Sequence, residues 1–368
     1  MRGLASWLDR LRASEHANLV QHFLRVFVPG IRPLDIDKWV VATDPQGPLI
    51  SSRVGSPEAW SVLRVCDHAG RPAVELEKLS AEMAALISLA LDRRVDIPFE
   101  VSIGSEGSDR IVFAPYADMI DRSFLGPIPI DSLPPIRDLL SRVCSLNESD
   151  QITLGDAMSL LHGAMLLFDR EARSAYTLLI AGIEVLSREY GRPPQNWDAW
   201  DDHSQWDTLF AESDLSAPQT ERVRAQLMRN RQLRLKATFR AYASERVPET
   251  FWDTSYDDWT YAIDITTGLP HDSPSHEIVR IQDILQKDRQ GLASALGKSY
   301  DLRSRFVHEG HWLSLPDLVL PLGRFAAWNR PLPFNVLRLL LAELIRTELA
   351  ARSTVKDLPA FSISRSSP

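Results

Sequence analysis

Helical periodicity dominates the middle of this sequence and leaves little freedom for the fold there. Apolar residues spaced four, three, four and three apart define one face of a helix: Leu154, Met158, Leu161, Met165 and Phe168. A second helix is predicted over residues 171–190, because Gly191 and Pro193-Pro194 follow it and would end it. Helices joined by so short a connection pack antiparallel. We therefore expect a helical bundle built around this pair.

Residues 135–352 are predicted to form one all-α domain. Further helices are expected over residues 219–243, 276–297 and 335–350. The last of these is so apolar that it should be buried nearly all round. The stretches 195–216 and 247–275 read as irregular, and residues 353–368 read as a flexible, Ser-rich tail. The protein is therefore predicted to be mainly α overall.

Residues 1–134 have a different pattern, which predicts a small α+β domain. An amphipathic helix is expected over residues 4–28 and another over 81–92. Gly- and Asp-containing turns separate short segments that read as strands: 38–43, 59–66, 73–77, 99–103 and 110–113. Residues 126–135 contain four prolines and read as a linker. A length of 368 residues agrees with two domains at roughly 150 residues each.

Composition excludes several classes of protein. The chain carries 41 Lys and Arg against 49 Asp and Glu, a net charge of −8, which argues against a non-specific nucleic-acid coat but leaves room for a local basic patch. Cys66 and Cys144 are the only cysteines, so a disulfide framework or a cysteine-rich zinc module has no support. No apolar run approaches the roughly 18 to 20 residues of a membrane span, and no secretory pattern is present. We expect a cytoplasmic protein with no membrane association.

The segment from Tyr300 to Gly310 holds the residues best suited to chemistry. Arg303 and Arg305 can present planar donors to phosphate oxygens, and His308 can move a proton near neutral pH. On a regular helix Arg303 and His308 lie about 140° apart, whereas Ser304 and Arg305 share a face with His308. The alternative is a histidine at a helix end beside arginines that pair with acids.

This segment, Tyr-Asp-Leu-Arg-Ser-Arg-Phe-Val-His-Glu-Gly, resembles the signature of HEPN domains, in particular the ApeA-like group. The family hallmark is Arg, four to six residues and His, and four residues separate Arg303 from His308 here. Residues 175–186 resemble the second helix of the family, which carries a Glu before a hydrophobic pair, and Glu184 fits that place. The resemblance covers residues 151–350 and not the N-terminal part.

The resemblance implies a helical bundle that dimerises and, in catalytic members, cleaves RNA without a metal or other cofactor. His308 would be the general acid or base, and Arg303 would bind the scissile phosphate. Glu184 would orient Arg303 or Arg305, or form a structural ion pair. Ser304 departs from the Asn, Asp or His of many nucleases, and it cannot carry charge.

Two functional readings therefore stay open. The first is a metal-independent endoribonuclease of microbial defence or toxin type, acting on RNA such as a tRNA, as a homodimer, with a trigger ligand or protein at the N-terminal domain. The second is a non-catalytic HEPN module for dimerisation or for binding RNA or a partner. No His-Glu-x-x-His, Gly-x-Gly-x-x-Gly or Gly-Lys-Ser/Thr motif points to a metal or nucleotide cofactor.

A basic run at residues 222–240 is a second candidate RNA contact. It contains seven Lys or Arg and no acid. On a continuous helix four of them would form one stripe able to follow a phosphate backbone: Arg222, Arg229, Lys236 and Arg240. A helix break near Asn230 is also compatible with the pattern. The alternative is a solvated face that pairs with the acidic loops 198–214 and 253–264.

Overall fold

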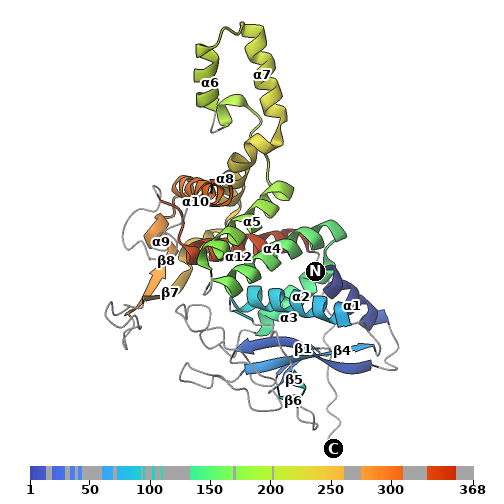
Figure 1. Ribbon diagram of the computed structural model, residues 1–368. Helices are drawn as coiled ribbons and strands as arrows, with labels where there is room; N and C mark the ends of the chain where they lie inside the picture. Colours follow the sequence, from blue (N-terminus) through green and yellow to red (C-terminus); the bar gives the residue numbers. More distant parts are fainter. Residues whose placement is uncertain are drawn as a thin grey trace, which may run out of the picture.

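A computed structural model shows a mainly helical protein. It describes residues 1–13, 19–29, 34–37, 40–43, 60–68, 73–92, 94–95, 102–103, 109–110, 133–168, 171–200, 203–260, 275–309 and 330–353. In Figure 1 a sheet lies at one end, a layered helical body occupies the middle, and a pair of helices projects from the other end. Within the described residues, no helix combines the length and apolarity needed to cross a bilayer.

The N-terminal sheet is antiparallel with strand order β1-β4-β3-β2. Its strands are β1 (Leu19–Pro29), β2 (Leu34–Asp37), β3 (Val40–Thr43) and β4 (Trp60–His68). The predicted helix over residues 4–28 is wrong, because α1 (Arg2–Ala13) ends early and a strand follows. Residues 19–29 are rich in Val, Phe and Leu, and β-branched and aromatic side chains favour a pleated surface.

The strand predicted over residues 73–77 is also wrong, because this segment opens α2 (Ala73–Leu91). Its Ala, Glu and Leu residues are strong helix formers, which agrees with the observed state. The predicted helix over 81–92 lies within the same element. Two further predicted strands overlap the small sheet of β5 (Ser102–Ile103) and β6 (Asp109–Arg110), and the rest of them lies outside the described residues.

The helices that flank the sheet share one hydrophobic core with the central bundle. Buried side chains form a continuous cluster that includes Trp7 of α1, Leu86 of α2 and Met158 of α4. Glu82 of α2 accepts hydrogen bonds from the amides of Gly3 and Leu4, at 3.3 and 2.7 Å, which fixes the start of α1. Apolar burial thus continues across residue 134, where the sequence predicts a domain boundary.

The central helices match the expected pair, α4 (Glu148–Leu167) and α5 (Ala172–Tyr190). The apolar face predicted for the first helix is buried at all five positions. Against them packs the mostly buried α12 (Phe334–Arg352), which also contacts α3 (Leu133–Ser145). Gly182 permits the close approach of α5 to α12, because a Cβ there would lie 2.6 Å from Cδ2 of Leu341.

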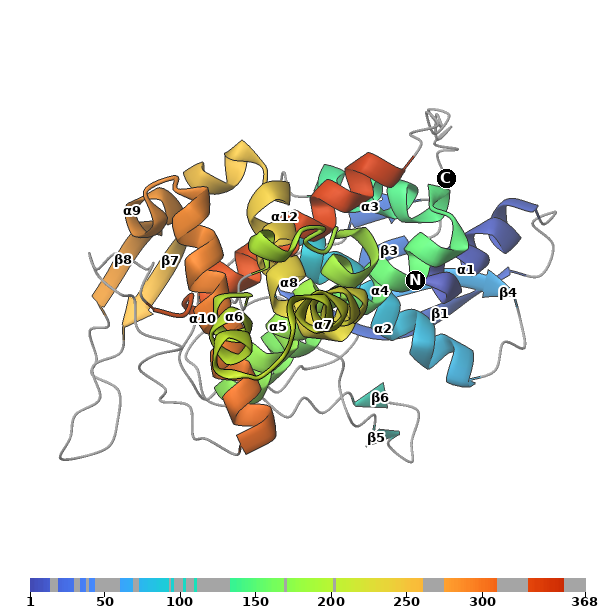
Figure 2. The same cartoon turned by 90° about the horizontal axis from the view of Figure 1, so that it is seen from above.

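The second half of the chain adds helices and a hairpin to this bundle. The helices α8 (Leu235–Arg246) and α10 (Arg289–Glu309) pack together and cover α5 (Figures 1 and 2). Residues 255–280, partly predicted as helix, instead contain the hairpin of β7 (Ser255–Thr260) and β8 (Ser275–Arg280), followed by α9 (Ile281–Leu285). The stretch 195–216, predicted as irregular, contains α6 (His203–Glu212), which pairs with α7 (Ala217–Arg229).

Candidate functional site

The Arg-x4-His segment lies on the last turns of α10, and its first arginine faces α5. Arg303 Nη2 lies 3.5 Å from Oε2 of Glu184, so the two segments that carry the family resemblance contact each other. The side chains are only 20% and 9% exposed, respectively. Leaving either charge unpaired there would be costly. Glu184 therefore both orients Arg303 and ties α5 to α10.

Tyr300 joins this ion pair, and the sequence reasoning missed it. Its hydroxyl donates a hydrogen bond to Glu184. Burial, and secondarily the negative charge of Glu184, raise the pKa of Tyr300 to about 12, while Arg303 and Arg188 oppose the shift. Its ring packs on Phe239 of α8 with centroids 5.4 Å apart. A Tyr one helical turn before the Arg is the signal that could have identified this position.

His308 lies in the final turn of α10, and its side chain is exposed. Because α10 is continuous from Arg289 to Glu309, His308 and Arg303 lie about 140° apart around the axis. The structure therefore does not bring Arg303 and His308 onto one face within a single chain. Arg305, which is exposed, and Ser304, which is half-buried, lie on the His308 side.

An open hollow of about 530 Å³ lies along α10 next to these residues. Ser304, Arg305 and Lys298 contribute to its lining, and Asp301 and Glu309 add acidic groups. Asp301 is already paired, because its Oδ1 lies 2.8 Å from Nζ of Lys236. The hollow thus presents Arg305 and Lys298 beside the exposed histidine, and Arg303 does not line it.

The basic run at 222–240 does not form one continuous stripe. Helix α7 ends at Arg229, a 3₁₀ turn, η4 (Arg231–Arg234), follows, and α8 starts at Leu235. The expectation of a single four-residue stripe is therefore wrong. Arg222 and Arg229 are exposed on α7, while Lys236 and Arg240 face α10.

On α8 these basic side chains serve packing. Lys236 pairs with Asp301, and Nε of Arg240 donates to the carbonyl of Ala293 at 2.8 Å. The aliphatic part of the Arg240 side chain also lies against Gly297, where a Cβ would lie 3.1 Å from Cδ of Arg240. These contacts hold α8 on the helix that carries the Arg-x4-His segment. They leave Arg222 and Arg229 as the more accessible members of the predicted RNA-binding set.

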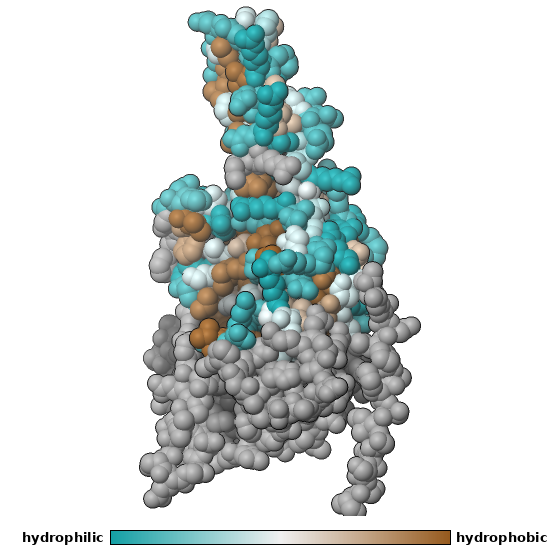
Figure 3. All heavy atoms as spheres, turned by 90° about the vertical axis from the view of Figure 1, so that its right-hand side faces the viewer, coloured by the Kyte–Doolittle hydropathy of each residue, from teal (hydrophilic) through white to brown (hydrophobic). Residues whose placement is uncertain are grey.

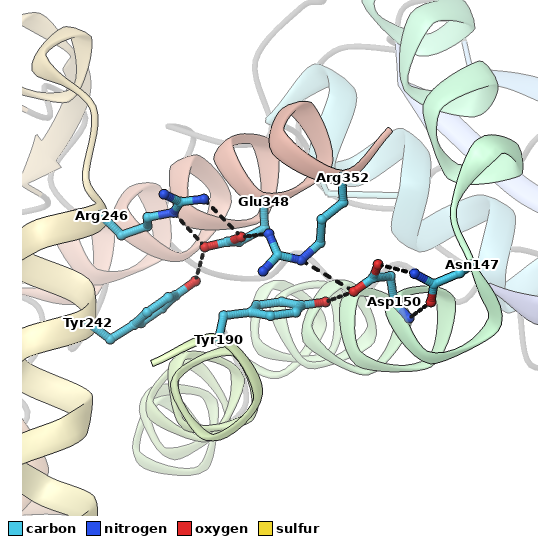
Figure 4. Close-up of polar contacts among 7 residues, drawn as sticks. All are labelled: Asn147, Asp150, Tyr190, Tyr242, Arg246, Glu348 and Arg352. Carbon is cyan, nitrogen blue, oxygen red and sulfur yellow. Dashed lines mark hydrogen bonds and ion pairs between the residues drawn. The ribbon is translucent and has the colours of Figure 1, made fainter. Parts of the chain in front are cut away.

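A second polar cluster, also missed in the sequence, fastens α12 to three neighbouring helices (Figure 4). Glu348 is 1% exposed and accepts from the hydroxyl of Tyr242 at 3.0 Å and from Nε of Arg246 at 2.8 Å. Arg352 also pairs with Glu348, and its Nε lies 3.3 Å from Asp150 of α4. The guanidinium of Arg352 lies 3.6 Å from the ring centroid of Tyr190. This network is structural, because each charge has a partner within the helical body.

No group of three or more His, Cys, Asp or Glu side chains within the described residues is placed to hold a metal ion. Comparison with protein-family models, with curated proteins and with solved structures finds no match for this chain. The function proposed below therefore depends on the geometry around α5 and α10 and on the sequence resemblance.

Proposed function

We propose that this protein is a metal-independent endoribonuclease of the HEPN type that acts in microbial defence. The observation that carries the proposal is the contact between Arg303 and Glu184, with His308 exposed further along the same helix. The two resembling segments are about 120 residues apart in sequence, and the contact between Arg303 and Glu184 supports the proposal because it joins them.

His308 is suited to proton transfer, because an imidazole can both accept and donate a proton and this one is exposed. It would remove the proton of a ribose 2′-OH as that oxygen attacks phosphorus. The 5′-oxygen would leave with a proton returned by a general acid, giving a 2′,3′-cyclic phosphate and a free 5′-hydroxyl. No metal is required for this transesterification.

Arginines would stabilise the charge that develops on the phosphate. Arg305 is exposed on the His308 side, so it can contact a phosphate bound near His308 in the same chain. Arg303 is held by Glu184 and has its Nε buried without an acceptor among the described residues. We propose that Arg303 reaches the scissile phosphate from the second copy of a homodimer, which would bring the two halves of the motif together.

The test is incubation of the purified protein with tRNA and with total RNA in EDTA. Cleavage should be lost in His308→Ala and strongly reduced in both Arg303→Ala and Arg305→Ala. Arg280→Ala, which removes an exposed arginine of β8, is the matched control and should cleave like the wild type. Cleavage that persists unchanged in His308→Ala and Arg303→Ala would show that the nuclease assignment is wrong.

A non-catalytic HEPN module is the second candidate, and two observations favour it. Ser304 occupies the place where many nucleases carry a charged or amide side chain, and Arg303 and His308 lie about 140° apart around α10 within one chain. A non-catalytic module would bind RNA or a partner without turnover. Binding that weakens in Arg222→Glu and Arg229→Glu, with no cleavage product in any condition, would support it. For either candidate function, we propose that a trigger ligand or protein regulates the activity by binding to the N-terminal region.

A further inference from the structure

A projecting arm, which carries Arg222 and Arg229, lies outside the contact between Arg303 and Glu184. The arm consists of η3 (Trp197–Ala199), α6 and α7, and it extends from the body beyond α5 and α8 (Figure 1). The space-filling view shows it standing clear of the body, with apolar side chains gathered along one edge (Figure 3). An extension of this kind presents a large surface relative to its volume.

The helices of the arm bury none of their residues, which is unlike the helices of the body. Neither α6 nor α7 contains a buried side chain. Leu209 in α6 is 54% exposed, and Leu215 in the turn is 40% exposed. Burying a Leu side chain contributes roughly 1.5–3 kcal/mol, so this surface gains from being covered.

The arm is nevertheless held in shape by an aromatic cluster at its base and by Arg224. Trp197 contacts Trp200 and Phe210, with ring centroids 5.4 and 6.0 Å apart. Arg224 lies over the rings of Trp197 and Phe210 and pairs with Asp207 at 2.7 Å. The two helices are thus fixed relative to each other, and the exposed leucines lie outside this cluster.

The two segments of the arm differ in charge, and we call them the acidic limb (residues 198–214) and the basic limb (residues 222–229). Residues 198–214, which include α6, contain six acids and no Lys or Arg: Asp198, Asp201, Asp202, Asp207, Glu212 and Asp214. Between 222 and 229, α7 contains three arginines and no acid. Because Arg224 is used within the arm, Arg222 and Arg229 remain, seven residues apart on one exposed face.

Four charged side chains of these exposed surfaces have no ion-pair partner among the described residues. Glu212 and Asp214 are exposed, and no ion pair joins them to a residue in the described ranges. Arg222 and Arg229 are in the same situation. Leu209 and Glu212 are three residues apart, so an apolar and an acidic side chain share one face of α6.

We propose that two copies of this chain associate through their arms about a two-fold axis. In a two-fold contact every pairing occurs twice, so the acidic limb of each arm would face the basic limb of the other. The exposed leucines would be buried between them. A second copy fits the arm better than an unrelated partner does, because one arm already carries both of the complementary surfaces. The ribonuclease proposal also invokes a homodimer, but it does not specify this interface, and the variants below test the interface without a cleavage assay.

Sedimentation equilibrium of the full chain at low salt tests the association. The wild type should be a dimer. The acidic-limb variant is Glu212→Lys with Asp214→Lys, and the basic-limb variant is Arg222→Glu with Arg229→Glu. In each variant like charges face each other, so the dissociation constant of the dimer should rise about tenfold or more. A mixture of the two variants in equal amounts should form dimers again. Raising the salt concentration should weaken the wild-type dimer.

The matched control is Glu77→Lys with Glu245→Lys, which makes the same charge change at exposed positions of α2 and α8. It should remain a dimer, and circular dichroism should show that all variants are folded. A monomeric wild type would overturn the proposal. A dimer that survives in both limb variants, or limb variants that fail to associate when mixed, would overturn it as well.

Discussion

The helical body and the arm are both made of α-helices, but different forces order them. Helices α5 and α12 bury most of their side chains in a shared core, where Gly182 lies in close contact with Leu341. Helices α6 and α7 bury no side chain and depend on ring contacts and on the ion pairs of Arg224. Burial ties the stability of a helix to the whole domain, whereas exposed contacts stabilise it locally. We therefore expect the arm to open without the body.

Truncation of one buried tryptophan in each region tests with the largest expected effect whether the arm unfolds separately from the body. Trp252 in the body and Trp200 at the base of the arm are 1% and 2% exposed, so each truncation to Ala should cost about 3–5 kcal/mol. For Trp252→Ala we expect this loss in the free energy of global unfolding, measured in urea. For Trp200→Ala we expect the amides of α6 and α7 to exchange rapidly while the global midpoint stays unchanged. Equal shifts of the global midpoint would show that arm and body unfold together.

Loss of Glu348 should have a comparable effect on the body alone. Glu348→Ala leaves the hydroxyl of Tyr242 and the guanidinium groups of Arg246 and Arg352 without their shared acceptor. Because Arg246 and Arg352 are partly exposed, we expect about 3 kcal/mol, the lower end for a broken buried pair. Urea unfolding measures it, and hydrogen exchange in the arm should not change. Glu245→Ala, which removes an exposed acid of α8, is the control and should be neutral.

Tyr300 should link the stability of the body to alkaline pH. The fold raises the pKa of Tyr300 from 10.0 to about 12, chiefly by burial, so the neutral hydroxyl is favoured in the folded state. Its stabilising contribution is fully present below pH 10 and is lost as pH rises through 12. Tyr300→Phe should lower the free energy of unfolding by about 1 kcal/mol at pH 7 through the lost hydrogen bond to Glu184.

The same variant should also flatten the decrease in stability between pH 10 and 12, measured by urea unfolding at several pH values. Burial also raises the pKa of Tyr190 and of Tyr242, so Tyr300→Phe should retain the part of the slope that these two residues contribute. A slope that is identical in Tyr300→Phe and in the wild type would contradict the assigned environment. Measuring RNA cleavage by Tyr300→Phe also tests whether cleavage depends on the orientation of Arg303.

Sequence periodicity predicted the body well because its helices are long and bury one side. The apolar face from Leu154 to Phe168 is buried as predicted, and so is most of α12. The arm was predicted poorly, because α6 is short, buries nothing and lies among Trp and Asp residues that read as a loop. The boundary between α1 and β1 was missed because Leu19, Phe23 and Val26 of β1 also recur at helical spacing, and periodicity alone cannot assign a short apolar run.

For the candidate site, sequence spacing identified the residues but not their contacts. Glu184 was assigned to orient an arginine or to form an ion pair, and it contacts Arg303. Tyr300 was missed because its role arises from burial against Phe239 and Glu184, which no local pattern reveals. Lys236 and Arg240 were assigned to RNA because charge alone was visible, whereas tertiary packing directs them to α10.

Helix capping gives the smallest test of the comparison between body and arm. In the body, Oδ1 of Asn147 accepts the amide of Asp150 at 2.9 Å and caps α4, so Asn147→Ala should lower global stability by about 1 kcal/mol. In the arm, Oε1 of Gln219 accepts the amide of Ser216 at 2.9 Å at the start of α7. Gln219→Ala should speed amide exchange in the first turn of α7 and leave the global midpoint unchanged, because the arm contributes no buried surface to the body. If both substitutions lower the urea midpoint equally, the arm unfolds together with the body, and the proposed difference between the two regions is wrong.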